Sequence, residues 1–210
     1  MKFNGLFFVF FLLLCPYLKA QTKSDVFSTS VEVTWLGLDF SGAKLIGDRE
    51  KLGSESDIHR LLDAINDLMI KEADKYNVAA AIKRKTVETG IDIVHEHNTE
   101  LDVLAMISND GKDHLHLNAD DVQGIVGSYD FKGKTGIGLI FNVESFNKLV
   151  DEGSFWITFV NMDTKEVLFT ERLTAPPSGF GLRNFWAGAV AGVLAKMKKK
   201  EFENWRVKHG

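Results

Sequence analysis

The chain of 210 residues contains a single cysteine, Cys15, which lies inside an apolar N-terminal segment. If that segment is removed on export, the remaining chain has no thiol, which excludes disulfides and cysteine nucleophiles. A chain of this length buries about 70% of the surface that its unfolded form exposes. We therefore expect the fold to be held together by a hydrophobic core alone.

The apolar N-terminal segment has the composition of a secretory signal peptide. Lys2 supplies the positive start, residues 6–14 form the apolar run, and Ala20 is a small residue at the expected cleavage point. The run is about half as long as the roughly 20 residues that a membrane-spanning helix needs. We expect cleavage after Ala20 and export to the periplasm or the extracellular space. Lipidation at Cys15 is the alternative, and Leu14 disfavours it because that processing needs a small residue at this position.

The chain also lacks an excess of basic residues. Removal of Lys2 and Lys19 with the leader takes the formal charge from −4 to −6. An acidic chain without a large basic stripe is unsuited to nucleic acid as its main partner. We expect no transmembrane span in the mature chain, because the uncharged stretch at residues 184–195 covers only 12 residues. The expected partner is an envelope protein or a surface component.

The common catalytic motifs are missing as well. No serine lies in a Gly-x-Ser-x-Gly elbow. Residues 132–135 resemble part of a phosphate loop, but Ser128 stands where that motif needs glycine, and a strand follows where it needs a helix. Gly136 and Gly138 do not complete the dinucleotide pattern, because Phe141 occupies the third glycine position. Hydrolase and nucleotide-binding functions of these kinds are therefore disfavoured.

Hydrophobic patterning predicts one domain over residues 29–210, preceded by a polar, flexible lead-in at residues 21–28. Runs of β-branched and aromatic residues predict strands, and Gly37 within the first run predicts a bulge or a close backbone approach. Apolar residues at helical spacing predict helices. Residues 96–118 stay unassigned. The expected strands are residues 31–40, 86–93, 136–146, 154–162 and 166–173, and the expected helices are residues 58–73, 78–83, 118–126 and 182–197.

The order of these elements predicts an α/β or α+β fold, with helices packed against a mixed sheet of about five strands. The connections between the last three strands are short and polar, which predicts an antiparallel C-terminal meander. Residues 154–162 are apolar on both faces of the strand, so we expect this strand to be central in the sheet.

The C-terminal part of the chain resembles a group of exported bacterial proteins. Residues 154–197 comprise a strand, the turn MDTKE at residues 162–166, a strand ending in Leu168 and Phe169, a loop with Gly and Ser, and a closing helix. This layout is similar to that of the small α/β lipoproteins that activate penicillin-binding proteins and of the curli-secretion lipoproteins. The resemblance implies a non-catalytic binding or assembly role in the cell envelope.

Two pairs of histidines are the candidate metal ligands. His95 and His97 lie two residues apart, as do His114 and His116. Residues two apart on a strand share a face, so each pair is placed to bind one zinc or similar divalent ion. The corresponding function is a metal-dependent enzyme or a metal-binding protein. The alternative is that all four are solvated histidines in a polar connection.

The last expected helix offers a candidate surface for a partner. Gly188 and Gly192 help to make one side of this helix small and uncharged. A helix that is apolar on both sides is usually buried on both sides. This side therefore either packs within the chain or contacts a second copy in a structural homo-oligomer.

A basic cluster follows the same helix. Lys198, Lys199 and Lys200 lie close in sequence to Trp205, a combination suited to an anionic membrane surface or an acidic envelope polymer. Stabilisation of the helix dipole is the alternative role of these charges. Taken together, the sequence favours an exported, non-catalytic binding or assembly protein of the cell envelope with no resident cofactor.

Overall fold

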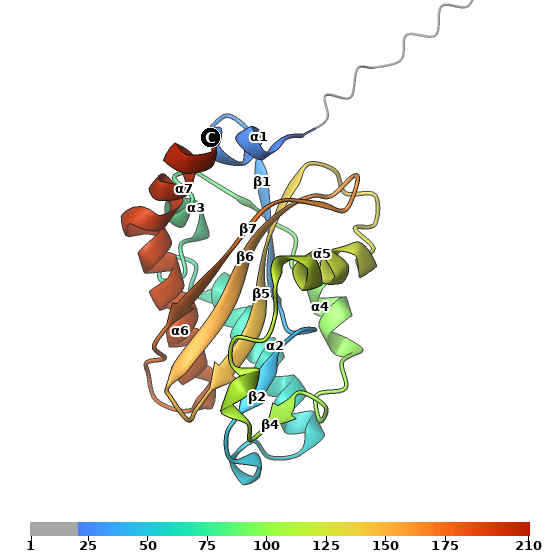
Figure 1. Ribbon diagram of the computed structural model, residues 1–210, viewed down its shortest axis with the longest axis vertical. Coiled ribbons are helices and arrows are strands. Elements are labelled where there is room, and N and C mark those ends of the chain that lie inside the picture. Colours follow the sequence, from blue (N-terminus) through green and yellow to red (C-terminus); the bar gives the residue numbers. More distant parts are fainter. Residues whose placement is uncertain (1–20) are drawn as a thin grey trace, which may run out of the picture.

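The computed structural model describes residues 21–210, so the leader, Cys15 and the expected cleavage point lie outside the described residues. The chain has the predicted α/β architecture, with helices on a mixed sheet (Figure 1). The seven strands are β1 (Val33–Asp39), β2 (Lys44–Ile46), β3 (Glu88–Thr89), β4 (Ile107–Ser108), β5 (Ile137–Asn147), β6 (Glu152–Asn161) and β7 (Glu166–Ala175). The helices are α1 (Lys23–Phe27), η1 (Arg49–Lys51), α2 (Glu55–Lys71), α3 (Val78–Ala81), α4 (Asp92–Thr99), η2 (Gly111–Asp113), α5 (Ala119–Ser128), α6 (Leu182–Lys196), η3 (Met197–Glu201) and α7 (Phe202–His209).

The seven strands occupy five rows, because two rows each consist of two short strands. One edge of β5 pairs with β6, and the other edge pairs in parallel first with β1 and then with β2. On the far side of these, β3 pairs with β1, and β4 pairs with β2. The rows in order are therefore β3 with β4, β1 with β2, β5, β6 and β7. The expectation of about five strands matches the number of rows, not the number of strands.

The antiparallel meander at the C-terminal end is confirmed. β5, β6 and β7 follow one another in the chain and pair in antiparallel fashion. β6 lies between the other two, and Phe155, Ile157 and Phe159 on this strand are fully buried. The strand expected to be central at residues 154–162 is therefore an interior strand with a neighbour on each side, although β5 is the middle row of the sheet.

The irregularity predicted at Gly37 is present in β1. The register of β1 against β5 shifts between Trp35 and Gly37, and the φ angle of +105° at Gly37 lies in a region that favours glycine. A Cβ atom at this position would lie 3.0 Å from Oδ1 of Asn66 on α2. Both the bulge and the close approach therefore require glycine here.

Side-chain amides cap the outer edge of β1 where β3 ends. Asn66 accepts a hydrogen bond from the backbone N–H of Leu38 at 2.8 Å and donates to the Leu38 carbonyl at 2.9 Å. Asn98 on α4 accepts from the N–H of Phe40 at 3.0 Å and donates to the same Leu38 carbonyl at 2.9 Å. A primary amide offers a donor and an acceptor, as a peptide group does. These two buried side chains thus replace a missing neighbouring strand.

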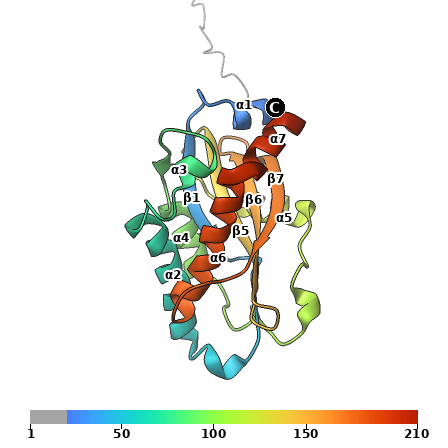
Figure 2. The same ribbon diagram turned by 90° about the vertical axis from the view of Figure 1, so that its left-hand side faces the viewer.

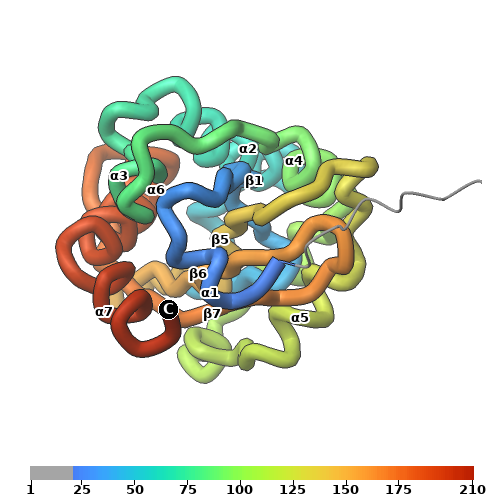
Figure 3. The backbone as a smooth tube through the Cα atoms, turned by 90° about the horizontal axis from the view of Figure 1, so that it is seen from above, coloured from blue at the N-terminus to red at the C-terminus, as the bar shows by residue number. Residues whose placement is uncertain are grey.

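Helices cover both faces of the sheet (Figure 3). The face covered by α2, α3, α6 and α7 carries the larger core, which includes Trp35, Phe141 and Trp186. The face covered by α4 and α5 carries a smaller cluster around Leu36 and Ile140. The predicted helices at residues 58–73 and 182–197 correspond to α2 and α6, which lie against each other.

The flexible lead-in expected at residues 21–28 is wrong, because this segment contains the helix α1. Val26 and Phe27 at the end of the helix are buried. The ring of Phe27 packs edge-on against Phe169, with the ring centroids 5.2 Å apart. A helix of five residues is too short to show an apolar period in the sequence, which is why composition alone was misleading.

The strand expected at residues 86–93 is largely wrong. Only Glu88 and Thr89 pair with β1, and the chain turns into α4 at Asp92. The apolar residues Ile93 and Val94 face the sheet from this helix, not from a strand. The short apolar run did not distinguish a strand from a helix, because a helix of eight residues and a strand give similar patterns over this length.

Candidate functional site

The structure does not assemble the predicted metal site from His95 and His97. Both lie on α4, and residues two apart on a helix point about 200° away from each other. The Nδ1 atom of His95 lies 3.4 Å from a carboxylate oxygen of Asp63. The ring of His97 stacks on Tyr129 with the centroids 4.5 Å apart. The shared-face argument for this pair is therefore wrong.

The other two histidines are engaged within the protein. Nδ1 of His114 lies 2.7 Å from the hydroxyl of Ser145, and its Nε2 lies 3.0 Å from a carboxylate oxygen of Glu152. Both ring nitrogens of His116 contact backbone carbonyl oxygens, at 2.7 and 3.1 Å. Across residues 21–210, no group of three or more His, Cys, Asp or Glu side chains is placed to hold a metal ion.

We expect added zinc to leave the melting temperature of the protein unchanged, because His95 and His97 point to different sides of α4 and both ring nitrogens of His114 and of His116 contact protein atoms. Differential scanning fluorimetry with and without zinc, and metal analysis of the purified protein, provide the measurement. The double variant His95→Ala, His97→Ala is the matched control and should melt with the same zinc independence. Stoichiometric zinc that is lost in this variant would contradict the prediction.

Ser145, His114 and Glu152 have the residue types of a catalytic triad but not its proton arrangement. The hydroxyl of Ser145 donates to the backbone carbonyl of His114 at 2.8 Å, so its single proton is engaged by that carbonyl oxygen. Ser145 is fully buried. A nucleophilic serine needs a base that accepts its proton. These three side chains therefore form a structural link between η2, β5 and β6.

A buried ion pair lies beside this link. Glu144 on β5 is fully buried, and its Oε2 lies 2.8 Å from Nε of Arg172 on β7 and accepts from Ser154 at 2.7 Å. Its other oxygen accepts the backbone N–H of Leu117 at 2.7 Å, and Arg172 donates to the Leu117 carbonyl. The Arg172 guanidinium also lies 4.7 Å above the ring of Trp156.

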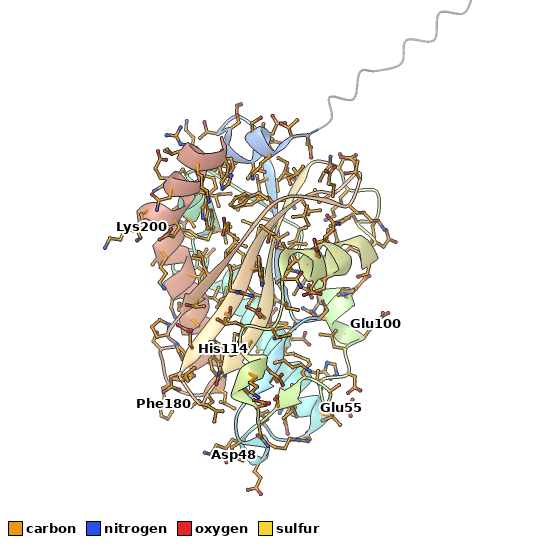
Figure 4. All side chains as sticks on the ribbon, in the orientation of Figure 1. Asp48, Glu55, Glu100, His114, Phe180 and Lys200 are labelled. Atoms are coloured by element: carbon orange, nitrogen blue, oxygen red, sulfur yellow. The ribbon has the colours of Figure 1, made fainter. Side chains whose placement is uncertain are left out.

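These contacts hold His114 and Leu117 against β5, β6 and β7. His114 is labelled in Figure 4. Neither Glu144 nor Arg172 was identified from the sequence, because their partners come from segments that are distant in the chain. One signal was available, since Asn142 and Glu144 alternate with apolar residues in a strand that is otherwise buried. A charge at such a position needs a buried partner.

Asp39 and Tyr129 form a second buried polar group on the same face. Asp39 accepts hydrogen bonds from the Asn142 side chain at 2.7 Å and from the Ser41 N–H at 2.8 Å. Burial, and to a lesser degree the nearby Asp39 carboxylate, raises the pKa of Tyr129 well above its usual value of 10.0. Tyr129 therefore stays protonated at neutral pH.

Gly188 and Gly192 pack against the chain itself, which corrects their assignment to a partner surface. A Cβ atom at Gly188 would lie 2.1 Å from the carbonyl oxygen of Ser178, and one at Gly192 would lie 2.8 Å from the side chain of Ala175. The segment that leaves β7 thus passes directly over α6. The two glycines make this crossing possible within one copy of the chain.

The basic cluster retains its lysines but not its aromatic residue. Trp205 is only 7% exposed, and its ring packs on Phe169 with the centroids 5.2 Å apart. It belongs to the core, so its assignment to a surface is wrong. Lys198, Lys199 and Lys200 are exposed on a turn of π-helical geometry, and Lys200 is visible at the margin of the molecule (Figure 4).

An apolar pocket lies at the carboxyl ends of β2 and β5. Its volume is about 60 Å³. The rings of Phe146 and Trp186 stack in its wall, with centroids 4.7 Å apart. Ligands commonly bind outside the carboxyl ends of parallel strands in open α/β sheets. The main apolar lining residues are Leu45, Leu52, Leu61, Phe146, Leu182 and Trp186.

Exposed apolar side chains lie at the same end of the molecule. Leu149 and Val150 in the turn between β5 and β6 are 59% and 62% exposed, and Phe180 before α6 is 95% exposed. Figure 4 shows Phe180 at the lower end, far from α1 and α7 in the matching view of Figure 1. We call the pocket, together with Leu149, Val150, Phe180 and Leu182, the apolar end.

The apolar end is the candidate functional site. An exposed apolar group of this kind is typical of an interaction surface. It was not predicted from the sequence, because its residues come from four segments separated along the chain.

Within residues 21–210, no helix is both long enough and apolar enough to cross a bilayer.

Comparisons with known proteins do not assign the chain to a family. No family model matches it, and no curated protein is similar to it. One solved structure with weak similarity is that of a neuraminyllactose-binding hemagglutinin homolog from Helicobacter pylori. The two chains share 9% sequence identity and a TM-score of 0.31, with 91% of this chain and 95% of that chain covered. At this level of similarity the match supports neither a shared fold nor a shared function.

Proposed function

We propose that the protein is an exported, non-catalytic binding protein of the cell envelope, and that its apolar end takes up an apolar side chain of a protein partner. The observation that carries the proposal is the exposure of Phe180, Leu149 and Val150 around an apolar pocket. Export is inferred from the leader sequence at residues 1–20. The envelope role is inferred from the resemblance of residues 154–197 to envelope lipoproteins.

The size of the pocket favours a side chain over a free ligand. An engineered apolar cavity of about 150 Å³ binds a benzene molecule, whereas the pocket has about 60 Å³. It therefore accommodates one aliphatic side chain, while Phe180 and its exposed neighbours supply a surrounding apolar contact. An anchor side chain in a pocket with further contacts around it is typical of protein interfaces.

The buried titratable groups support a non-catalytic role. Glu144 and Asp39 are fully buried, and each accepts several hydrogen bonds from within the chain. His114 contacts protein atoms through both ring nitrogens. Their contacts hold residues 114–118 and the end of β1 in place.

The proposal is tested with a photo-activatable amino acid at position 180 of the protein in its host. We expect one discrete protein adduct. The adduct should disappear when Leu52→Asp places a charge in the pocket wall. Folding of this variant is checked by its melting temperature, since Leu52 lies on a partly exposed turn.

The matched control carries the same amino acid at position 207. Val207 is 77% exposed on α7, at the other end of the molecule. No adduct is expected there. The same adducts from both positions, or an adduct at 180 that persists in the Leu52→Asp variant, would overturn the proposal.

A further inference from the structure

β7 is the last row of the sheet and pairs only with β6. In Figure 2 it is visible between α6 and α7 on one side and α5 on the other. A groove of about 340 Å³ runs along Val167 to Glu171 of this strand. Its walls include Gln123 of α5 on one side and Lys23 and His209 on the other. The open side of β7 is therefore accessible along part of its length.

Hydrogen bonding within the meander shows which residues of β7 face away from the sheet. The N–H of Met162 donates to the Gly136 carbonyl at 2.9 Å, so even-numbered residues of β6 direct their backbone groups toward β5, and odd-numbered residues direct theirs toward β7. The odd-numbered residues of β6 pair with Phe169, Glu171 and Leu173 of β7. The residues that turn their N–H and C=O groups outward are therefore Thr170, Arg172 and Thr174.

Contacts at both ends of the strand agree with this assignment. Val167 donates its N–H to the side-chain oxygen of Gln123 at 2.9 Å, and the Gln123 amide donates to the Lys165 carbonyl at 3.0 Å. At the other end, Lys196 donates to the Thr174 carbonyl at 2.6 Å. Both Val167 and Thr174 face outward because the register shift between them inserts one extra residue.

The middle of the edge has no such cap. Gln123 covers the start of β7 in the way that Asn66 and Asn98 cover the edge of β1. Within residues 21–210, no hydrogen bond from outside the sheet reaches the backbone of Thr170 or Arg172. An uncapped edge of this kind is a template for a further strand.

We propose that the open stretch at residues 170–173 of β7 accepts an extended strand from a partner polypeptide. The partner's backbone pairs with the outward N–H and C=O groups, which adds a row to the sheet. Thr170 favours a β-branched side chain opposite it, and Glu171 favours a neighbouring basic side chain. This surface is separate from the apolar end, so the inference does not depend on the proposed function.

The charges on the strand disfavour a second copy of the chain as the partner. Antiparallel pairing about a two-fold axis at residue 172 places Arg172 opposite Arg172. A shift of the axis by one residue places Glu171 opposite Glu171. Like charges directly opposite each other destabilise a strand pair.

The test measures amide hydrogen exchange by NMR with a defined peptide, acetyl-Thr-Val-Thr-Val-Lys-Val-Thr-Val-Thr-amide. In the free protein we expect fast exchange at Thr170 and Arg172 and slow exchange at their neighbours Phe169, Glu171 and Leu173. Saturating peptide should slow exchange at Thr170 and Arg172 by about tenfold or more. The same peptide with all of its central backbone amides N-methylated should have no effect, because neither of its edges then offers N–H groups that can pair with β7.

The variant Thr170→Pro removes an outward N–H that bonds to no strand, and it should abolish the effect of the peptide. If this variant does not fold, the comparison of the unmodified peptide with the N-methylated peptide tests the proposal by itself. Slow exchange at both amides of the free protein, or an equal effect of the two peptides, would overturn the proposal. Sedimentation that shows a dimer lost in Thr170→Pro would overturn it in favour of a second copy.

Discussion

Replacement of Gly188 by leucine should lower the free energy of unfolding by about 3 kcal/mol or more. The Cβ atom alone would lie 2.1 Å from the carbonyl oxygen of Ser178 and 2.6 Å from its backbone nitrogen. Backbone atoms cannot yield as the end of a flexible side chain does, so the crossing of this segment over α6 would have to open. Urea denaturation followed by circular dichroism measures the loss.

Gly127 on α5 is the matched control for this change. A Cβ atom there meets nothing within 4 Å, so Gly127→Ala should stabilise the protein by roughly 0.5–1 kcal/mol through the better helix propensity of alanine. Analytical ultracentrifugation of Gly188→Leu tests the alternative explanation. A folded variant with unchanged stability and an altered oligomeric mass would show that this side of the helix contacts another copy.

The second large effect is expected from Arg172→Met. This change leaves the fully buried carboxylate of Glu144 without its ion-pair partner. Removal of one member of a buried pair costs about 3–5 kcal/mol. We expect a value near the lower end, because the Arg172 side chain is 30% exposed and water can partly replace it. The measurement is again the free energy of unfolding in urea.

Two further variants separate the buried charge from the packing. The double variant Glu144→Leu, Arg172→Met removes both charges and should recover part of the stability, since an apolar pair often substitutes well for a buried ion pair. Arg206→Met breaks the exposed pair with Glu203, whose atoms lie 2.6 Å apart, and should lower the free energy of unfolding far less than Arg172→Met does. An equal loss for Arg172→Met and Arg206→Met would show that burial of Glu144 does not govern the effect.

The parts of the fold that follow from the sequence are those with long and regular patterns. α2 and α6 each bury a run of apolar residues over several turns, and the meander combines long apolar strands with short polar turns. Gly37 was also identified correctly, because a glycine inside an apolar strand usually marks a bulge or a close backbone approach. These elements lie in the larger core.

The remaining elements depend on partners that are distant in the chain. α1 is stabilised by Phe169 and Phe202, both more than a hundred residues away. Within residues 96–118, which the sequence left unassigned, His114 and Leu117 are held by side chains of β5, β6 and β7. For the same reason the histidines could not be placed, since their contacts with Tyr129, Ser145 and Glu152 arise only in the folded chain.

The candidate surfaces also depend on contacts between segments that are distant in the chain. Gly188 was recognised as unusual, but the sequence does not specify whether the chain itself or another molecule covers it. The apolar end combines residues from four segments, so no local pattern signals it. The open edge of β7 requires the sheet order and the register of three strands, which hydrophobic patterning does not define.

The arrangement of the two termini determines how the protein can be oriented on a surface. α1 and the C-terminus lie together at one end of the long axis, and Phe180 lies toward the other (Figures 1 and 4). A tether at either terminus would therefore direct the apolar end outward into the solution. Immobilisation through a terminal tag should leave Phe180 and the pocket free, whereas coupling through a cysteine introduced at position 149 should hide them.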